Sequence, residues 1–180
     1  ILAFIIVKFI IYPGIGLIFH TNYPIVAVVS SSMEHNGLKF DEWFDKSKDF
    51  YLDYNFSKSQ FKELHFSNGF NKGDIMLLYG TAPQNIKVGS VVVYQSPSKL
   101  TAYPIIHRVV SKEYKNNIYY FRTKGDNLGN RIDPWEISQN QILGRAILRI
   151  PLLGWVKILA VDYIVKPYCQ LTNNLWPCRK

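Results

Sequence analysis

The 180-residue sequence contains little cysteine, little histidine and little charge. Its two cysteines, Cys169 and Cys178, are too few for a fold built on disulfides, and whether they pair is open from the sequence. The four histidines have no metal-ligand spacing, and no glycine-rich phosphate loop occurs. The sequence therefore predicts no cofactor and no metal ion.

Basic residues outnumber acidic ones, with 21 lysines and arginines against 13 acidic residues and a formal net charge of +8. A balance of this size suits nucleic acid, anionic lipid or another acidic ligand. The basic residues are scattered singly and carry no nucleic-acid-binding signature, so nucleic acid is not an expected partner. Together with the apolar ends of the chain, this pattern favours a membrane surface.

The mean hydropathy of −0.03 averages a polar middle with two apolar ends. Residues 1–19 carry one charge, Lys8, and a helix of this length extends about 28 Å, enough to cross a bilayer. We therefore predict a transmembrane anchor over residues 1–22 and expect the natural chain to begin upstream of Ile1. A cleaved secretory signal is the alternative, but no small-residue cleavage site follows the segment.

The second apolar segment, residues 150–165, is short and is interrupted by proline, glycine and two charges. It does not suit a second membrane span. Its tryptophan and tyrosine are typical of segments at the headgroup level. We assign residues 151–180 to an apolar interfacial or packing segment and a C-terminal tail.

Short β-branched runs fill the middle of the chain, at 24–31, 74–80, 88–95, 105–111, 118–123 and 142–150. Runs of this length bounded by glycine, proline or asparagine predict strands. Residues 111–120 give the clearest hairpin, because Asn116 and Asn117 tolerate left-handed backbone angles. Since no helices alternate with the runs, residues 23–150 are expected to form a mainly β domain, an antiparallel sheet or small barrel.

A helical insertion is expected in this domain at about residues 37–70, where aromatic residues recur at helix-like intervals. Ser57 followed by Gln60 is typical of a capping box that opens a second short helix, through His65. The insertion could cover an active site, recognise substrate or only pack on the sheet. Its aromatic stripe favours packing.

A hydroxyl nucleophile is the remaining candidate chemistry. Ser30, Ser31 and Ser32 end the first predicted strand, where the backbone turns. Taken alone, such a run is typical of a polar turn. The segments that follow are more specific: KGDI at 72–75, GSVVVY at 89–94, IHRVV at 106–110, TKGDN at 123–127 and DPW at 133–135.

In this order the segments resemble type I signal peptidases over about residues 25–155. Because the basic residue is His107, the chain is most similar to the archaeal and endoplasmic-reticulum branch, which uses histidine where the bacterial enzymes use lysine. The resemblance implies a β-rich, membrane-bound serine endopeptidase that cleaves N-terminal signal peptides from secreted preproteins. It implies a single-pass protein of the cell membrane with its catalytic domain outside the cytoplasm, and signal peptides, membrane lipids and possible accessory subunits as partners.

Serine needs a neighbouring base, and a free imidazole is mostly neutral at neutral pH. His107 therefore suits general base and then general acid catalysis for Ser32. A carboxylate must orient the imidazole. Asp133 is the first choice because it matches the family's second aspartate. The interval from Asp126 to Asp133 is slightly longer than the family's usual one. This leaves the choice between them open, with Asp126 second. The other carboxylate is expected to cap the loop, paired with Arg131 or Arg108.

The oxyanion is expected to receive hydrogen bonds from the backbone N–H of Ser32 and from Ser30, which resembles the family's side-chain donor. Alternation along a strand places Ser30 on the same face as Ser32 and turns Ser31 away. The chain departs from the family at His35, where proline is usual. His35 is a weaker alternative base, and the following Asn36-Gly37 can supply the turn.

Two other functions stay open on the sequence. One is a membrane-anchored β module that binds a partner or assembles a complex without catalysis. The other is a self-cleaving protease of the repressor type, which is disfavoured because those enzymes are soluble and pair serine with lysine. The catalytic hypothesis requires Ser32 and His107 to lie close together, whereas the hypothesis of a binding module does not.

Overall fold

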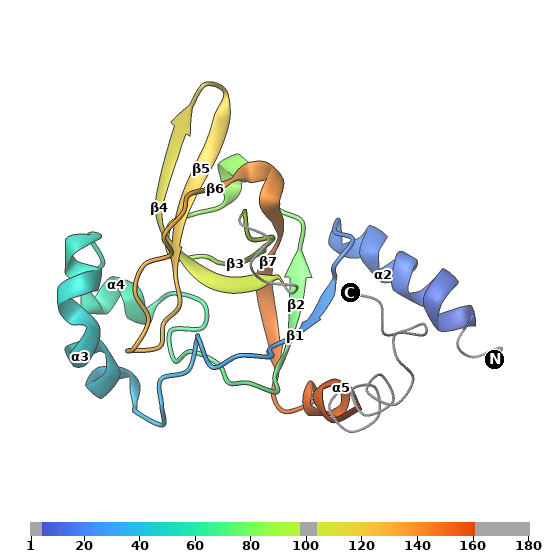
Figure 1. The fold of residues 1–180 in the computed structure, drawn as a ribbon, viewed down its shortest axis with the longest axis horizontal. Helices are drawn as coiled ribbons and strands as arrows, with labels where there is room; N and C mark the ends of the chain where they lie inside the picture. Colours follow the sequence, from blue (N-terminus) through green and yellow to red (C-terminus); the bar gives the residue numbers. More distant parts are fainter. Residues whose placement is uncertain (1–4, 98–103, 161–180) are drawn as a thin grey trace, which may run out of the picture.

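The computed structural model describes residues 5–97 and 104–160 and is built around one antiparallel sheet. Seven strands follow the order β1-β2-β7-β3-β4-β5-β6, and the sheet curls into a half-barrel (Figure 1). The strands are β1 (Ile25–Ala27), β2 (Ile75–Tyr79), β3 (Val91–Tyr94), β4 (Ile105–Lys115), β5 (Ile118–Lys124), β6 (Ile137–Ser138) and β7 (Ile142–Ile150). The prediction of a mainly β, antiparallel fold is confirmed, and each of the six predicted runs overlaps one strand.

The helices lie around the sheet, with α3 and α4 at one end and α2 at the other (Figure 1). They are α2 (Tyr12–Phe19), which continues the π-helical turn η1 (Val7–Ile11), α3 (Phe40–Asp53), α4 (Lys58–Lys62) and α5 (Trp155–Ala160). Two short 3₁₀ turns, η2 (Pro83–Asn85) and η3 (Gln139–Gln141), complete the elements. The predicted helical insertion is confirmed as α3 and α4.

The N-terminus of α4 has the predicted capping box. Ser57 Oγ accepts from the Gln60 backbone N–H at 3.3 Å, and Gln60 Oε1 accepts from the Ser57 backbone N–H at 3.1 Å. The helix ends at Lys62, short of the predicted His65, and the chain then turns through Phe66, whose φ is 60°. A bulky residue rarely adopts this left-handed backbone, so the surrounding packing determines it.

The β4–β5 hairpin turns at Asn116 and Asn117, as predicted. Both have positive φ, 52° and 62°, and Lys115 pairs with Ile118 across the turn. Two consecutive left-handed residues match the right-handed twist of the flanking strands. The pairing extends β4 to Lys115, beyond the predicted end of this strand.

Both faces of β3 are buried, and this places the core on two sides of the sheet. Val91 and Val93 pack with Met33, Met76 and Leu78 on one face, whereas Val92 and Tyr94 pack with Phe121 and Ile137 on the other. A third cluster is made by aromatic residues of the insertion around Trp43, Tyr51 and Phe61, and it reaches Val110 on β4. The insertion therefore packs on the sheet, as its aromatic stripe predicts.

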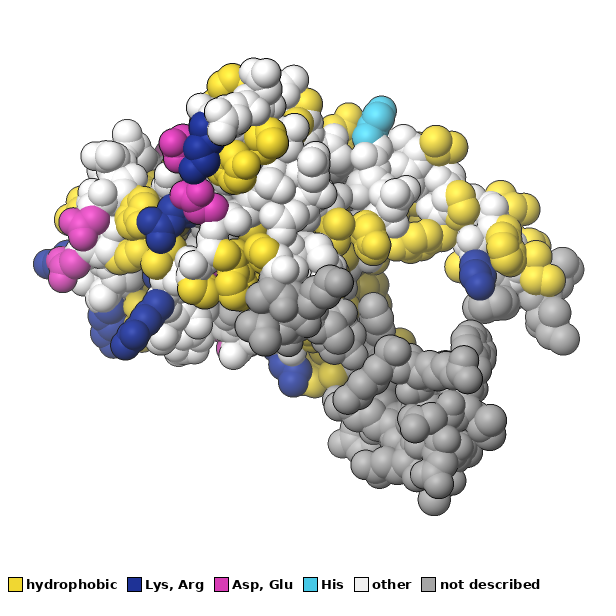
Figure 2. Space-filling model, turned by 45° about the horizontal axis from the view of Figure 1, so that its top comes forward, with side chains coloured by type: hydrophobic (Ala, Val, Ile, Leu, Met, Phe, Trp, Pro, Cys, Tyr) yellow, Lys and Arg dark blue, Asp and Glu magenta, His cyan; other side chains and the backbone are white. Residues whose placement is uncertain are grey.

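The apolar N-terminal segment forms a helix whose side chains are largely exposed, among them Phe9 at 64% and Leu17 at 79% (Figure 2, right). Within residues 5–97 and 104–160, no helix is long and apolar enough to span a membrane. A second group of exposed apolar residues surrounds α5: Leu152, Leu153, Val156 and Leu159. Cys169, Cys178 and the rest of residues 161–180 lie outside the described residues.

Candidate active site

His107 on β4 and Asp133 in the loop after β5 are in contact. His107 Nδ1 lies 2.8 Å from Asp133 Oδ2. Val92 is the ladder partner of His107 on β3, which fixes the direction of the imidazole on the sheet. Asp133 is held in turn by its backbone N–H, which donates to Thr123 O on β5 at 2.9 Å.

Two hydroxyls share the Asp133 carboxylate with the histidine. Tyr94 OH and Thr123 Oγ1 donate to Oδ2 at 2.9 and 2.5 Å. Burial opposes ionisation of Asp133, but the hydrogen bond and charge of His107, aided by the two hydroxyls, lower its pKa below the usual value. Asp133 is therefore a carboxylate at neutral pH, and it accepts from three side chains.

Asp126 lies in a different polar cluster and is fully buried. Arg108 Nε lies 3.0 Å from both oxygens of Asp126, Arg108 Nη2 lies 2.5 Å from Oδ2, and Tyr51 OH donates to Oδ1 at 2.8 Å. The remaining guanidinium hydrogens go to the carbonyls of Gly89, His65 and Phe66. Of the two arginines considered for this carboxylate, Arg108 is the partner.

Ser32 lies in the turn after β1, beside the loop that follows β5. Its carbonyl oxygen accepts from the Asn127 backbone N–H at 2.9 Å and from Asn130 Nδ2 at 2.8 Å. A Cβ added at Gly125 would lie 2.5 Å from Ser32 O and 2.9 Å from His107 Nε2. The backbone of Ser32 and the imidazole of His107 are therefore neighbours, separated by Gly125.

The Ser32 hydroxyl lies 3.2 Å from the Ser30 hydroxyl. The two hydroxyls are thus close, but in a turn and not by alternation along a strand, because β1 ends at Ala27. Ser31 contributes its carbonyl, which accepts from Asn127 Nδ2 at 3.1 Å. In the described part of the chain, no hydrogen bond joins Ser32 Oγ to His107.

His35 precedes the insertion and packs against it. It is 4% exposed, and its ring stacks on Trp43 with the centroids 3.8 Å apart and the planes at 4°. Among residues 5–97 and 104–160, neither ring nitrogen of His35 has a hydrogen-bond partner. Burial, with the positive charges of Arg108 and Lys124, lowers the pKa of His35 to about 4 against an opposing effect of Asp126. Asn36 and Gly37 make the predicted turn, with φ of 54° and 77°.

Sequence reasoning missed several residues that hold these groups, namely Tyr94 and Thr123 at Asp133, and Trp43, Tyr51 and Lys124 around Asp126. Tyr94 and Thr123 stand inside segments that the sequence analysis used as motifs. For Tyr94 the available signal was a hydroxyl at the end of the apolar run VVVY, because a buried hydroxyl needs a partner.

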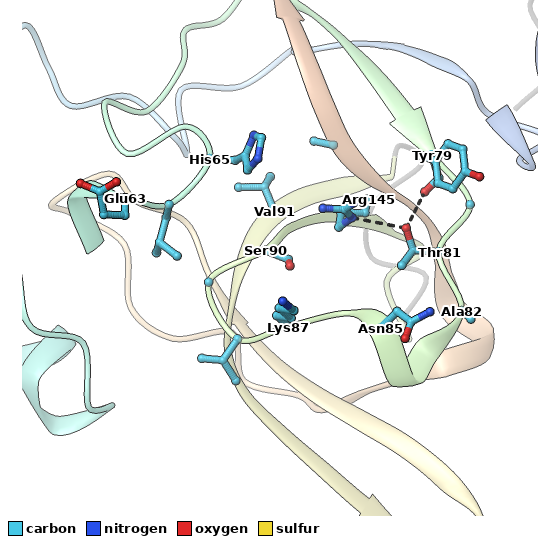
Figure 3. Close-up of a pocket in the computed structure, with 15 residues that line it drawn as sticks. Glu63, His65, Tyr79, Thr81, Ala82, Asn85, Lys87, Ser90, Val91 and Arg145 are labelled. Atoms are coloured by element: carbon cyan, nitrogen blue, oxygen red, sulfur yellow. Dashed lines mark hydrogen bonds between the residues drawn. The ribbon is translucent and has the colours of Figure 1, made fainter. Parts of the chain in front are cut away.

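Two large cavities lie away from this cluster. One, of about 690 Å³, lies among β2, β3, β7 and the segment after α4, and Arg145 donates from Nε to Thr81 Oγ1 at 3.3 Å in its wall (Figure 3). The other, of about 790 Å³, lies between α2 and the start of β7. None of Ser30, Ser32, His107, Asp126 and Asp133 lines either cavity. Among the described residues, no group of three or more histidine, cysteine or acidic side chains is placed to hold a metal ion.

Curated proteins similar to this chain share one description. The signal peptidase complex catalytic subunit sec11 of Schizosaccharomyces pombe is 30% identical over 169 residues, 89% of this chain and 79% of that protein. The SEC11 subunits of Scheffersomyces stipitis and Yarrowia lipolytica are each 26% identical, over 91% and 86% of this chain and 81% and 73% of their own lengths. No protein-family model matches the chain.

Proposed function

The chain belongs to the signal peptidase family, in its endoplasmic-reticulum and archaeal branch, and from this premise we propose that Ser32, His107 and Asp133 carry out the cleavage of signal peptides. The family makes the chain a serine protease. One observation carries the assignment of residues: His107 binds Asp133 through Nδ1 and turns Nε2 toward Gly125, beside Ser32.

In the proposed reaction, His107 is the general base. Its Nδ1–H donates to the Asp133 carboxylate, so Nε2 carries the lone pair. Ser32 Oγ rotates from Ser30 toward Nε2, gives its proton to that nitrogen and attacks the scissile carbonyl carbon. Asp133 stabilises the imidazolium that forms, and three hydrogen bonds to its carboxylate keep it ionised and oriented.

The tetrahedral intermediate carries a negative oxygen, for which we propose two donors. They are the backbone N–H of Ser32 and the hydroxyl of Ser30, which already lies 3.2 Å from Ser32 Oγ. Collapse of the intermediate breaks the peptide bond, and His107 Nε2–H protonates the leaving amine. A water then gives a proton to Nε2 and attacks the acyl-enzyme, which releases the cleaved signal peptide and regenerates Ser32.

We assign Asp126 a structural role because of its contacts. Its carboxylate accepts from Arg108 and Tyr51, and among the described residues no hydrogen bond joins it to His107. Loss of this carboxylate would leave the buried Arg108 without a counter-charge.

The proposed setting is the cell membrane. Residues 1–22 are proposed to be a single-pass anchor, residues 23–150 the catalytic domain outside the cytoplasm and residues 151–180 an apolar segment at the interface. The exposed apolar helix η1–α2 and the exposed leucines around α5 support this arrangement. Ser32 lies 13 residues after Phe19, so an anchored enzyme would work close to the lipid surface, to which its net charge of +8 is suited.

The proposed partners follow from this setting and from the relatives. Signal peptides of secreted preproteins are the substrates. Because the relatives are described as catalytic subunits of a signal peptidase complex, accessory subunits are proposed partners as well.

The test is a cleavage assay with detergent-solubilised protein and a radiolabelled preprotein. Wild type and Ser31→Ala are expected to release the mature protein, whereas Ser32→Ala and His107→Ala are expected to be inactive. Ser31→Ala is the matched control, because it removes a neighbouring hydroxyl that takes no part in the proposed chemistry. Equal cleavage by wild type and Ser32→Ala, or by wild type and His107→Ala, contradicts the assignment of these residues.

A further inference from the structure

The helical insertion donates two hydrogen bonds to one residue of the loop after β5. Trp43 Nε1 donates to the Asp126 carbonyl oxygen at 2.9 Å, and Tyr51 OH donates to Asp126 Oδ1 at 2.8 Å. Both donors belong to α3, and both side chains are 0% exposed. Packing alone requires only the apolar rings. Trp43 Nε1 and Tyr51 OH both bind Asp126, so α3 holds this loop by specific hydrogen bonds as well as by packing.

A third contact joins α3 to Lys124, the residue before Gly125. Lys124 is 4% exposed, and its ammonium lies 5.1 and 5.3 Å from the ring centroids of Phe50 and Tyr51 on α3. The ammonium also donates to the Gly125 carbonyl oxygen at 2.8 Å. Helix α3 therefore contacts the residue before Gly125 and the residue after it.

The loop that α3 holds is the one that contacts the proposed nucleophile and base. Gly125 lies against Ser32 O and His107 Nε2. Two residues later, the Asn127 backbone N–H donates to Ser32 O, and Asn130 Nδ2 donates to the same oxygen. A displacement of Asp126 would pass directly to Gly125 and Asn127 and would change the separation between Ser32 and His107.

We propose that Tyr51 and Trp43 are positioning residues, which hold the 125–130 loop so that Ser32 and His107 stay at a reactive separation. This inference rests on the proposed function, because it gives the insertion a part in that reaction. Both side chains are fully buried, so we assign them no direct contact with substrate. A misplacement of about 1 Å in such a site can lower a rate by about 100-fold, so hydrogen bonds distant from the chemistry can matter to kcat.

The test uses Tyr51→Phe in the full-length protein in detergent. This change removes the hydroxyl and keeps the ring in the aromatic cluster. Tyr54→Phe is the matched control, because Tyr54 lies on the same insertion and stacks on Phe50 at 4.8 Å, with no hydrogen bond from its hydroxyl among the described residues. Thermal unfolding of each variant sets an assay temperature at which all are folded.

The first readout is the split between kcat and KM on a preprotein. For Tyr51→Phe, kcat is expected to fall by about 5- to 100-fold with KM within about twofold of wild type, whereas Tyr54→Phe keeps both constants. A role in stability alone would lower the unfolding temperature and leave kcat unchanged. That result, or an equal loss in the two variants, overturns the proposal.

The second readout needs no catalysis, so it separates this proposal from the proposed function. Hydrogen exchange of the Asn127 amide reports on its bond to Ser32 O. Faster exchange in Tyr51→Phe than in wild type and Tyr54→Phe supports the positioning role, even if the wild type cleaves nothing. Unchanged exchange in Tyr51→Phe overturns the proposal, even if the loss of cleavage in Ser32→Ala supports the proposed reaction.

Discussion

His107 Nδ1 lies 2.8 Å from Asp133 Oδ2, an oxygen that Thr123 and Tyr94 also contact. One oxygen of the carboxylate thus contacts the imidazole and the hydroxyls from β3 and β5. Because both hydroxyls donate, they stabilise the ionised form and help to hold Oδ2 next to His107. The two aspartates of the loop thus differ in their partners: Asp133 contacts His107, whereas Asp126 contacts Arg108.

Asp133→Asn is expected to lower kcat by about 10³- to 10⁴-fold, because an amide that donates to Nδ1 would favour the wrong imidazole tautomer. The side chain keeps its size, but Thr123 and Tyr94 contact the same oxygen, Oδ2, as His107, so an amide nitrogen at this position removes their acceptor. The free energy of unfolding should therefore fall by about 1–3 kcal/mol. Preprotein cleavage and urea unfolding of the purified variant measure the two quantities, and wild-type kcat for Asp133→Asn would exclude it as the orienting carboxylate.

Asp126→Asn is expected to act chiefly on stability. The change removes the charge that compensates Arg108, whose guanidinium is fully buried, and breaking such a pair costs about 3–5 kcal/mol of unfolding free energy. Urea unfolding with wild type and Asp133→Asn alongside gives the comparison. A stable Asp126→Asn variant that has lost all cleavage would reverse the roles of the two aspartates.

Much of the fold could be predicted from β-branched runs and turn residues. The hairpin at Asn116 and Asn117 and the capping box at Ser57 depend on neighbours in the sequence, so local rules were sufficient. Strand β6 was missed because it has two residues, Ile137–Ser138, and only its pairing with β5 makes it a strand. The first predicted run is longer than β1, because pairing with β2 ends at Ala27 and the chain then turns toward Ser32.

The candidate site was predictable only where its residues stand in ordered motifs. His107 and Asp133 were singled out in this way, and they are in contact. The contacts of Asp126 with Tyr51 and Trp43 were not predictable, because 75 and 83 residues separate the partners in the sequence. The function of the insertion could not be predicted either. An aromatic stripe indicates a buried face but not what that face binds.

Gly125→Ala is expected to lower cleavage by about 100-fold or more. The added Cβ would lie 2.3 Å from Asn130 Nδ2, 2.5 Å from Ser32 O and 2.9 Å from His107 Nε2, so the loop or the imidazole must move. Gly129→Ala is the matched control, because a Cβ there meets nothing closer than Asn127 Oδ1 at 3.6 Å. Cleavage is measured at a temperature where circular dichroism shows both variants folded, and equal activity in the two would contradict the close approach at Gly125.

His35 is expected to make the protein less stable as the pH falls from about 6.5 to about 4. Its pKa is about 4 in the folded protein and 6.5 in the unfolded chain, so the unfolded state binds more protons across this window and gains stability on acidification. The loss approaches about 3 kcal/mol at the acid end, because each pKa unit corresponds to about 1.4 kcal/mol. In His35→Phe the ring can still stack on Trp43, but the proton uptake is gone.

Urea unfolding of wild type and His35→Phe at several pH values tests this. The difference in unfolding free energy between the two proteins should be flat above pH 7 and should grow in favour of His35→Phe as the pH falls toward 4.5. Carboxylates titrate in both proteins, so their contribution cancels in the difference. Two curves that stay parallel down to pH 4.5 would show that His35 takes up its proton as readily in the folded protein as in the unfolded chain.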